Sequence, residues 1–438
     1  MNKKPLLSFW QIWNMSFGFL GVQIGYSLQN GNTSRILSAL GANVEHLSYF
    51  WLAAPLAGLI IQPIIGLSSD KTWTRLGRRI PFILAGAIIS ALAMFFMPNS
   101  EFFTYLLPAV YFGGFMLLFM DASFNVTMQP FRALVGDMVS EEQRNKGYAI
   151  QSFLINTGAV VGSLLPFVLT KLGVANVPSP GEKVAPTVIW AFYFGGGTLL
   201  LSVLWTAIRT KEYPPREYET YNNITAEEKI HRSFFSLLKE IPVTMWRLAI
   251  VQFFSWFALF LTWVYTTSGV AQNVWHTAGG DSTSEAFNKA GNWVGVIFGA
   301  YSLFAAIYSL LLTKIAGKLG RKPTYMFSLL AGGIGLVSMV FIHNQYGLII
   351  SMVGLGIAWA AILAMPYAIL SAALPASKMG VYMGIFNATI TIPQIAAGLL
   401  GGVIVSLLGG KAILMLGVAG ICMLFAGIAV VFVKEHKE

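Results

Sequence analysis

The chain has 438 residues, of which 56% are hydrophobic and only 11% are charged. Soluble globular proteins are about 45–50% apolar and about 25% charged, so this composition excludes an ordinary water-soluble domain. The net charge of +10 is not an indication of nucleic-acid binding, because the basic residues lie in short clusters between apolar segments, as in the loops of membrane proteins. The one cysteine, Cys422, excludes an internal disulfide.

Twelve segments are apolar and long enough to cross a bilayer, which takes about 20 residues in a helix. We expect these spans at 10–30, 46–68, 80–98, 103–135, 147–171, 187–208, 245–271, 291–314, 323–342, 346–373, 380–407 and 411–433. The first apolar stretch is too long for a signal peptide and lacks a small-residue cleavage site, so we expect it to be a membrane helix. The sequence therefore predicts an all-α membrane protein.

Lysine and arginine are distributed unequally between the two sets of loops. Most lie on the side that holds both termini, and the opposite side has only Arg35, Lys171, Lys183, Lys289 and Lys411. Because positive residues are retained on the cytoplasmic side, both termini are predicted to be cytoplasmic. We expect a multi-pass protein of the cell membrane, meaning the inner or plasma membrane.

The longest loop divides the predicted spans six and six. We expect an N-terminal six-helix bundle at 1–209, a cytoplasmic linker at 210–244 and a C-terminal six-helix bundle at 245–438. Within the linker, TAEEKIHRSFFSLLKEI (225–241) is predicted to form an amphipathic helix on the membrane surface.

The two halves repeat short motifs in the same direction. TRLGRR (74–79) corresponds to GKLGRK (317–322), and MQPFRAL (128–134) corresponds to AMPYAIL (364–370). Two six-helix halves related in this way are the arrangement of the major facilitator superfamily of secondary transporters. The predicted fold is therefore twelve transmembrane helices in two six-helix bundles.

Asp121 is the one acidic residue that falls within a predicted span. A charged aspartate at the middle of a membrane helix costs about 2.5–3.5 kcal/mol even on lenient scales, so it is a functional candidate. Asn125 and Arg132 lie on nearly the same face of that helix, and Pro130 interrupts the helix between the charges. We expect this polar stripe to face the bundle interior or an aqueous cavity.

Two simpler interpretations stay open: Asp121 could only hydrogen-bond neighbouring helices, and Arg132 could extend to the cytoplasmic surface. The repeat favours a functional stripe, because the aligned residues of the second half, Ile357 and Ala368, are uncharged. Desolvation drives a buried carboxylate to bind a proton, and a nearby cation drives it to release one. We therefore predict proton coupling rather than a sodium site, which needs several oxygen ligands.

Three stretches of the first half, 21–29, 40–70 and 75–83, resemble the plant sucrose–proton symporters and their bacterial relatives. These proteins belong to the glycoside–pentoside–hexuronide transporters of the major facilitator superfamily. The segment D-x3-N-x4-P-x-R-A-L (121–134) resembles the family's fourth-helix motif. The resemblance implies that Asp121 accepts the proton and that Arg132 is its electrostatic partner or gate.

The resemblance extends to the second half through MPYAILS (365–371) and MGIFNATITIPQ (383–394). One departure lies at WFALFLTWVYTTSG (256–269), where plant members carry charged residues and this chain has none. Sucrose specificity therefore does not follow from the resemblance, and maltose or another disaccharide fits equally well.

Four residues match the superfamily's loop motif after the second span: Asp70, Gly77, Arg78 and Arg79. The resemblance implies a cytoplasmic gate that latches neighbouring helix ends in the outward-open state. The simpler alternative is that the arginines only satisfy the positive-inside rule.

Amides bind sugar hydroxyls, and aromatic faces pack against sugar C–H surfaces. The candidates within the spans are Gln23, Gln62, Asn125, Gln151, Asn156, Asn387, Gln394, Trp256, Trp263, Tyr265 and Trp359. Each is weak alone, because membrane tryptophans often anchor at the interface and membrane amides often join helices. Asn125 ranks first because it shares the face of Asp121, followed by Gln23 and Asn387 in the matched motifs.

The sequence as a whole predicts a secondary transporter that imports a disaccharide with a proton by alternating access. A proton-coupled antiporter or exporter of another small molecule on the same fold stays open, as does a channel. An enzyme is disfavoured because the five histidines lie in predicted loops or at their edges and no HExxH or GxSxG pattern occurs. We expect no cofactor or metal, and a monomer whose partners are a sugar, protons and membrane lipid.

Overall fold

The computed structural model describes residues 4–222, 241–278, 281–373 and 385–433. The first half forms α1 (Phe9–Ala39), α2 (Val44–Trp51), α3 (Ala53–Lys71), α4 (Ile80–Phe96), α5 (Ala109–Met138), α6 (Arg144–Lys171) and α7 (Pro186–Arg209), with the short 3-10 helices η1 (Met97–Phe103) and η2 (Glu141–Gln143). After α8 (Pro215–Asn222), the second half forms α10 (Val243–Val274), α11 (Glu285–Leu319), α12 (Arg321–Ser338), α13 (Gly347–Ala373), α15 (Ala388–Leu407), α16 (Ala412–Ala429) and η5 (Val430–Phe432). The prediction of an all-α membrane protein is confirmed.

Within the described residues, each predicted span overlaps a helix, and the second span is divided at Leu52 into α2 and α3. Within the described residues, ten helices are long and apolar enough to cross a membrane. The two predicted spans outside that group are α1, which carries many amide and hydroxyl side chains, and α12, which begins with Arg321 and Lys322. Both pack among apolar helices, α1 against α6 and α7, and α12 against α13 and α16.

The first predicted span, 10–30, was too short, because α1 continues to Ala39. The prediction that placed Arg35 in a loop is therefore wrong. Arg35 is 2% exposed and lies in the last turns of α1. A charged residue is excluded from a membrane helix only where it has no hydrogen-bond partner. Arg35 has partners, because Asn288 and Asn292 of α11 accept its hydrogen bonds.

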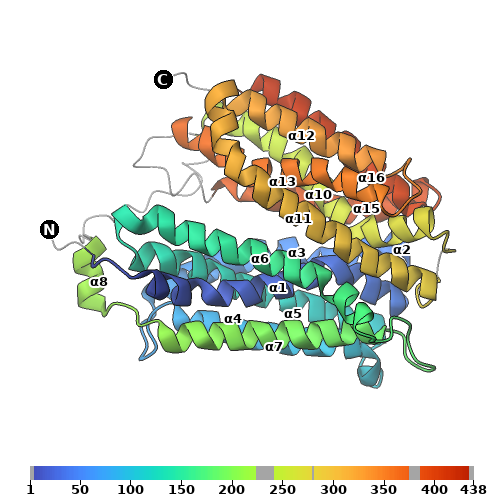
Figure 1. Ribbon diagram of the computed structural model, residues 1–438, viewed down its shortest axis with the longest axis horizontal. Coiled ribbons are helices and arrows are strands. Elements are labelled where there is room, and N and C mark those ends of the chain that lie inside the picture. Colours follow the sequence, from blue (N-terminus) through green and yellow to red (C-terminus); the bar gives the residue numbers. More distant parts are fainter. Residues whose placement is uncertain (1–3, 223–240, 279–280, 374–384, 434–438) are drawn as a thin grey trace.

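The helices form two groups that match the halves of the sequence (Figure 1). In the first half α1 packs on α6 and α7, and α5 packs on α3 and α4; in the second half α10 packs on α15 and α16, and α13 packs on α11 and α12. The exact division at 1–209, 210–244 and 245–438 stays a prediction. The helix predicted at 225–241 lies, except for Ile241, outside the described residues.

The two groups of helices converge at the end of the molecule opposite the termini and diverge toward the end that carries both termini (Figure 1). Contacts between the groups gather at the convergent end: α6 packs on α11, α2 packs on α15, and the Ser282 hydroxyl donates to the Ser38 carbonyl oxygen over 2.8 Å. The structure is therefore the state closed at the end opposite the termini.

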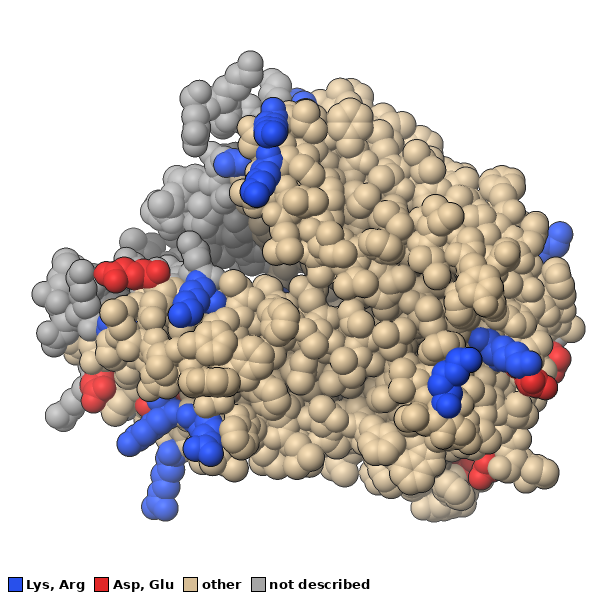
Figure 2. Space-filling view, viewed as in Figure 1, with Lys and Arg blue, Asp and Glu red and all other residues tan. Residues whose placement is uncertain are grey.

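Charged side chains gather at the two ends of the molecule on the face shown in Figure 2, and the middle of that face is occupied by uncharged residues. Large apolar side chains such as Leu201, Ile208 and Leu310 are 69–80% exposed. A wide uncharged band with exposed apolar residues is the surface that a bilayer requires.

Glycine allows a close approach between α1 and α6. A methyl group at Gly162 would lie 2.5 Å from the carbonyl oxygen of Ile24 and 2.9 Å from its Cα. Membrane helices commonly associate through small residues, because the backbones can then approach closely.

We expect Gly162→Ala to separate α1 from α6 and to lower the thermal unfolding midpoint of the purified protein, as overpacking costs about 1–3 kcal/mol. Gly197→Ala on α7 is the matched control, because a methyl group there has no neighbour within 4 Å. An unchanged midpoint for Gly162→Ala would contradict the close contact.

Candidate functional site

Asp121 lies in the middle of α5 and points into the first bundle toward α1. It is 3% exposed, and Gln29 of α1 donates from Nε2 to Oδ1 of Asp121 over 2.5 Å. The other carboxylate oxygen, Oδ2, has no hydrogen-bond partner among the described residues. Of the two environments expected for this acid, the structure has the bundle interior rather than an open cavity.

The other two residues of the predicted stripe have different surroundings. Asn125 is half-buried, and its side-chain amide donates to the backbone carbonyl oxygen of Asp121 over 2.8 Å. Arg132 is exposed, and no ion pair joins it to Asp121 in the described part of the chain. Arg132 interacts electrostatically with Tyr26 of α1 and with Tyr367 of α13 in the other half. The stripe thus combines a buried acid with an accessible cation.

Three tryptophans of the second half form one cluster. The ring centroids of Trp256 and Trp263 are 6.4 Å apart, and each lies 5.9 Å from the ring of Trp359. The Trp263 indole hydrogen-bonds Tyr301, which interacts electrostatically with Tyr26 of the first half. The sequence-predicted Trp256 and Trp359 therefore lie together, in a cluster that reaches α1.

Two of the other amides predicted to bind sugar are engaged with backbone. Gln151 is buried and donates to the carbonyl oxygen of Phe131, and Asn156 donates to that of Ser152 on its own helix. Such bonds fit the alternative that these amides join or brace helices. Their role in sugar binding stays a prediction.

The remaining predicted amides are Gln23, which is half-buried on α1, Gln394, which is half-buried on α15, and Asn387, which is exposed at the start of α15. The side chain of Gln62 lies outside the part of the chain that the structure describes. Two cavities, of about 380 and 370 Å³, lie on the outer surface of the first bundle along η1, α4 and α7. Neither of these cavities is lined by a predicted site residue.

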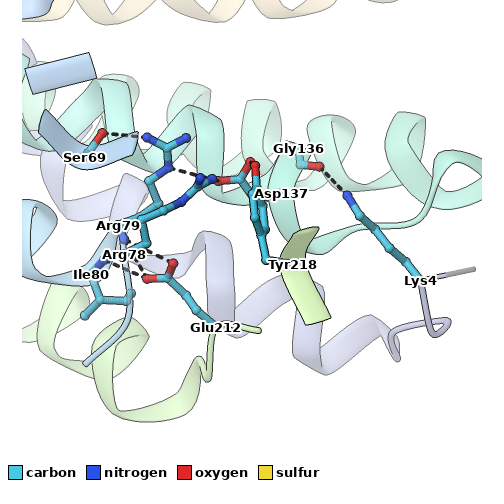
Figure 3. Close-up of polar contacts among 9 residues, drawn as sticks. All are labelled: Lys4, Ser69, Arg78, Arg79, Ile80, Gly136, Asp137, Glu212 and Tyr218. Carbon is cyan, nitrogen blue, oxygen red and sulfur yellow. Dashed lines mark hydrogen bonds and ion pairs between the residues drawn. The ribbon is translucent and has the colours of Figure 1, made fainter. Parts of the chain in front are cut away.

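The predicted gate motif centres on an acid that sequence reasoning did not single out, Asp137 at the end of α5 (Figure 3). Arg78 Nη2 and Arg79 Nε lie 2.5 and 2.9 Å from Asp137 Oδ2, and Arg79 Nη1 donates to Ser69 Oγ over 2.6 Å. The arginines thereby tie α3, α4 and α5 together. Asp137 falls outside the predicted spans, and the sequence-based prediction gave it no role. Its position at the end of one span, with two arginines at the start of a neighbouring span, could have indicated the ion pair.

Of the other two residues of the predicted gate motif, the structure describes Gly77 in full but not the side chain of Asp70. Gly77 has φ +114°, a conformation that suits glycine, and it closes a tight turn with Thr74 through reciprocal backbone hydrogen bonds. The gating role of the motif stays a prediction.

The start of the linker is fastened to this cluster. Glu212 accepts hydrogen bonds from the backbone N–H groups of Arg79 and Ile80, at 2.8 and 2.9 Å, and so satisfies the free N-terminus of α4. The Tyr218 hydroxyl donates to Asp137 Oδ1 over 3.2 Å, and the Arg78 guanidinium lies 3.9 Å above the Tyr218 ring (Figure 3). Burial raises the pKa of Glu212, although the backbone donors oppose that shift.

Residues 36–408 match the family model described as MFS/sugar transport protein. The chain belongs to this family of sugar transporters. It is a multi-pass membrane transporter and not an enzyme, and its predicted resemblance to the sucrose–proton symporter family is confirmed.

Two curated relatives of this sugar transporter illustrate the similarity. It is 27% identical over 308 residues to the general alpha-glucoside permease of Schizosaccharomyces pombe, covering 66% of this chain and 54% of the permease. It is 24% identical over 426 residues to the sucrose transport protein SUC4 of Arabidopsis thaliana, covering 87% of this chain and 81% of the relative. The chain thus spans about half the length of the yeast permease and about four-fifths of the plant protein.

Solved structures establish the fold. The crystal structure of a D-xylose-proton symporter aligns with TM-score 0.70 at 14% identity, covering 98% of this chain and 99% of that one. The crystal structure of the nucleoside transporter NupG aligns with TM-score 0.70 at 13% identity, covering 98% of this chain and 100% of NupG. At such low identity these alignments show the major facilitator fold alone.

We expect Asp137→Asn to destabilise the sugar transporter, because both guanidinium groups lose their carboxylate in a site where its side chain is 17% exposed. Removing one partner of a buried ion pair costs about 3–5 kcal/mol, and partial exposure places this site at or below that range. The measurement is the thermal unfolding midpoint in detergent. Glu285→Gln is the control, since it breaks a solvent-exposed pair with Lys289, and exposed pairs contribute little to stability. Equal effects of the two changes would contradict the proposed importance of the cluster.

We expect Glu212→Gln to alter the pH dependence of stability. Because the folded-state pKa of Glu212 is raised, the folded protein binds this proton more readily than the unfolded chain does. The stability of the unmodified protein should therefore fall, relative to that of Glu212→Gln, as pH rises from about 4 through the raised pKa. Unfolding midpoints of both proteins between about pH 4 and 7 test this. A difference that is constant with pH would argue against it.

Proposed function

We propose that the protein is a proton-coupled symporter that imports a disaccharide, such as sucrose or maltose, across the cell membrane by alternating access. Both termini would lie in the cytoplasm. The observation that carries this proposal is the lone carboxyl group of Asp121, buried in the middle of a membrane helix of a sugar transporter. A sucrose transport protein and an alpha-glucoside permease among the relatives support the choice of a disaccharide.

Asp121 has the surroundings expected of a proton carrier. An ionised carboxylate away from water needs a cation or several donors, and here a single neutral amide donates to it. Asp121 would carry the proton while its carboxyl group is buried, as in this state, and would exchange it with water when the bundles move. Arg132, which is accessible at the far end of the stripe, would contribute to release by attracting the ionised form.

The sugar would bind between the stripe and the tryptophan cluster. Trp256, Trp263 and Trp359 offer apolar ring faces to sugar C–H groups, and Trp256 Nε1 is a buried donor with no partner among the described residues. Asn125 would supply an amide from the opposite bundle. Gln23 and Asn387 follow as further candidates, and then Gln394, Gln151 and Asn156.

The closed end of the molecule fits the cytoplasm-facing half of a transport cycle. Arg35 of α1 donates to Asn288 and Asn292 of α11 over 2.8 Å each, and to Asn176 over 2.9 Å. With cytoplasmic termini, this network closes the outer side while the bundles diverge toward the cytoplasm. The cycle would proceed by breaking these contacts and closing the opposite end.

Uptake into proteoliposomes with an imposed pH gradient tests the proposal, with labelled sucrose and with maltose and lactose as competitors. An inward proton gradient should drive accumulation of a disaccharide above its external concentration. Accumulation that ignores the pH gradient and follows a sodium gradient would reject proton coupling.

We expect Asp121→Asn to abolish accumulation driven by the pH gradient while leaving some sugar exchange at equal concentrations, because an amide cannot carry the proton. Asp281→Asn is the control, since Asp281 lies in the loop before α11. Full accumulation by Asp121→Asn would exclude Asp121 as the coupling residue.

A further inference from the structure

Gln29, which the sequence did not single out, is the side chain that contacts the carboxyl group of Asp121. It is 1% exposed and lies on α1, and its Nε2 donates to Asp121 Oδ1 over 2.5 Å. The remaining polar atoms of the pair are Gln29 Oε1 and Asp121 Oδ2. Both are buried, and neither has a hydrogen-bond partner among the described residues.

The chemistry of the amide and the carboxyl group explains why the two atoms without a hydrogen-bond partner are both oxygens. A primary amide presents an N–H donor and a C=O acceptor side by side, and a protonated carboxyl group presents an acceptor and an O–H donor side by side. The two groups can therefore pair through two hydrogen bonds. An ionised carboxylate only accepts, so the N–H bond remains and the two other oxygens are left without a donor. A proton on Asp121 would provide the missing hydrogen-bond donor between these two oxygens.

We propose that Gln29 distinguishes the protonated from the ionised form of Asp121 by pairing with the protonated form through both of its polar atoms. With the proton on Oδ2, this O–H donates to Gln29 Oε1 while Nε2 continues to donate to Oδ1. When the proton leaves to water, the O–H bond is lost and the N–H bond is kept. Proton binding thus adds one buried hydrogen bond between α1 and α5. This inference rests on the proposed function of Asp121.

Few other titratable or charged groups compete for this role. Tyr26, one turn before Gln29 on α1, interacts electrostatically with Asp121, and Arg132 lies on α5 itself. Among the other helices that pack on α5, α4 has no titratable or charged residue, and η1, α3, α6 and α2 carry theirs near their ends: Glu101, Asp70, Lys71, Arg144, Lys146, Tyr148, Lys171, Glu45, His46 and Tyr49. The others on α1 and α5, Arg35, Tyr111 and Asp137, also lie near helix ends. Gln29 is a positioning residue, since it acts through Asp121.

The test compares Gln29→Met, a change of similar length without an amide, with the unmodified transporter. The pH at which sugar exchange is half-maximal should move by about 0.5–1 unit, the equivalent of one buried hydrogen bond. The infrared C=O band of the protonated carboxyl group, identified as the band that Asp121→Asn removes, should shift to higher frequency. A change that leaves the hydrogen bonds of the carboxyl group intact would not move that band.

Gln252→Met controls for loss of a buried amide, because Gln252 is fully buried in the other half and accepts a hydrogen bond from Tyr325 over 3.0 Å. It should leave both the pH profile and the band unchanged. Gln29→Asn serves as a second variant if Gln29→Met does not fold, since its amide is one methylene shorter and should also shift the band.

A folded Gln29→Met protein with an unchanged pH profile and band would overturn the inference. So would an equal shift of the pH profile when Gln29→Met is added to Asp121→Asn, since the effect would then not pass through the carboxyl group. Full accumulation by Asp121→Asn would instead reject the proposed function. Loss of accumulation in Asp121→Asn together with an unaltered band in Gln29→Met would reject the role of Gln29 alone.

Discussion

The bilayer offers no hydrogen bonds, and this constraint determines how the polar residues of the chain are placed. The amides and hydroxyls of α1 would be poorly tolerated against lipid, so the helix lies inside the first bundle with α5, α6 and α7 around it. The same constraint brings the carboxyl group of Asp121 and the amide of Gln29 together. This polar helix thereby faces both the buried acid and the second half of the molecule.

Polar contacts differ between the interior and the end that carries the termini. Around Asp121 the contacts are few and involve a neutral amide, whereas Asp137 is held by two guanidinium groups and a tyrosine hydroxyl. Ion pairs are compatible with this helix end, because the carboxylate and the guanidinium groups offset each other's cost of desolvation. A carboxyl group that gained and lost a proton, as proposed for Asp121, would be better served by surroundings without a fixed counter-ion. The two acids of α5 are therefore suited to different tasks, one chemical and one structural.

The sequence was sufficient to predict the helical architecture, because runs of about 20 apolar residues have no other common explanation. It also identified Asp121, whose charge conflicts with its apolar neighbours. It did not identify Gln29 or Asp137, because a glutamine in a polar helix and an acid at a helix end conflict with nothing nearby. Their importance comes from partners 92 and 58 or 59 residues away in the chain. Hydropathy likewise ended the first helix too early, since it counts a polar residue as exposed whether or not another helix can bind it.

One contact of the closed end opposite the termini is made by a guanidinium group whose partners, within the described residues, are amide oxygens. Asparagine dipoles can satisfy the hydrogen bonds of Arg35 but cannot neutralise its charge. Hydration of this cation would return whenever that end of the molecule opened, and it would offset part of the free energy lost with the amide bonds. None of the three asparagines titrates near neutrality, so this contact should hold equally well in acidic and neutral surroundings. Sensitivity to proton concentration would then reside deeper in the membrane, away from the entrance.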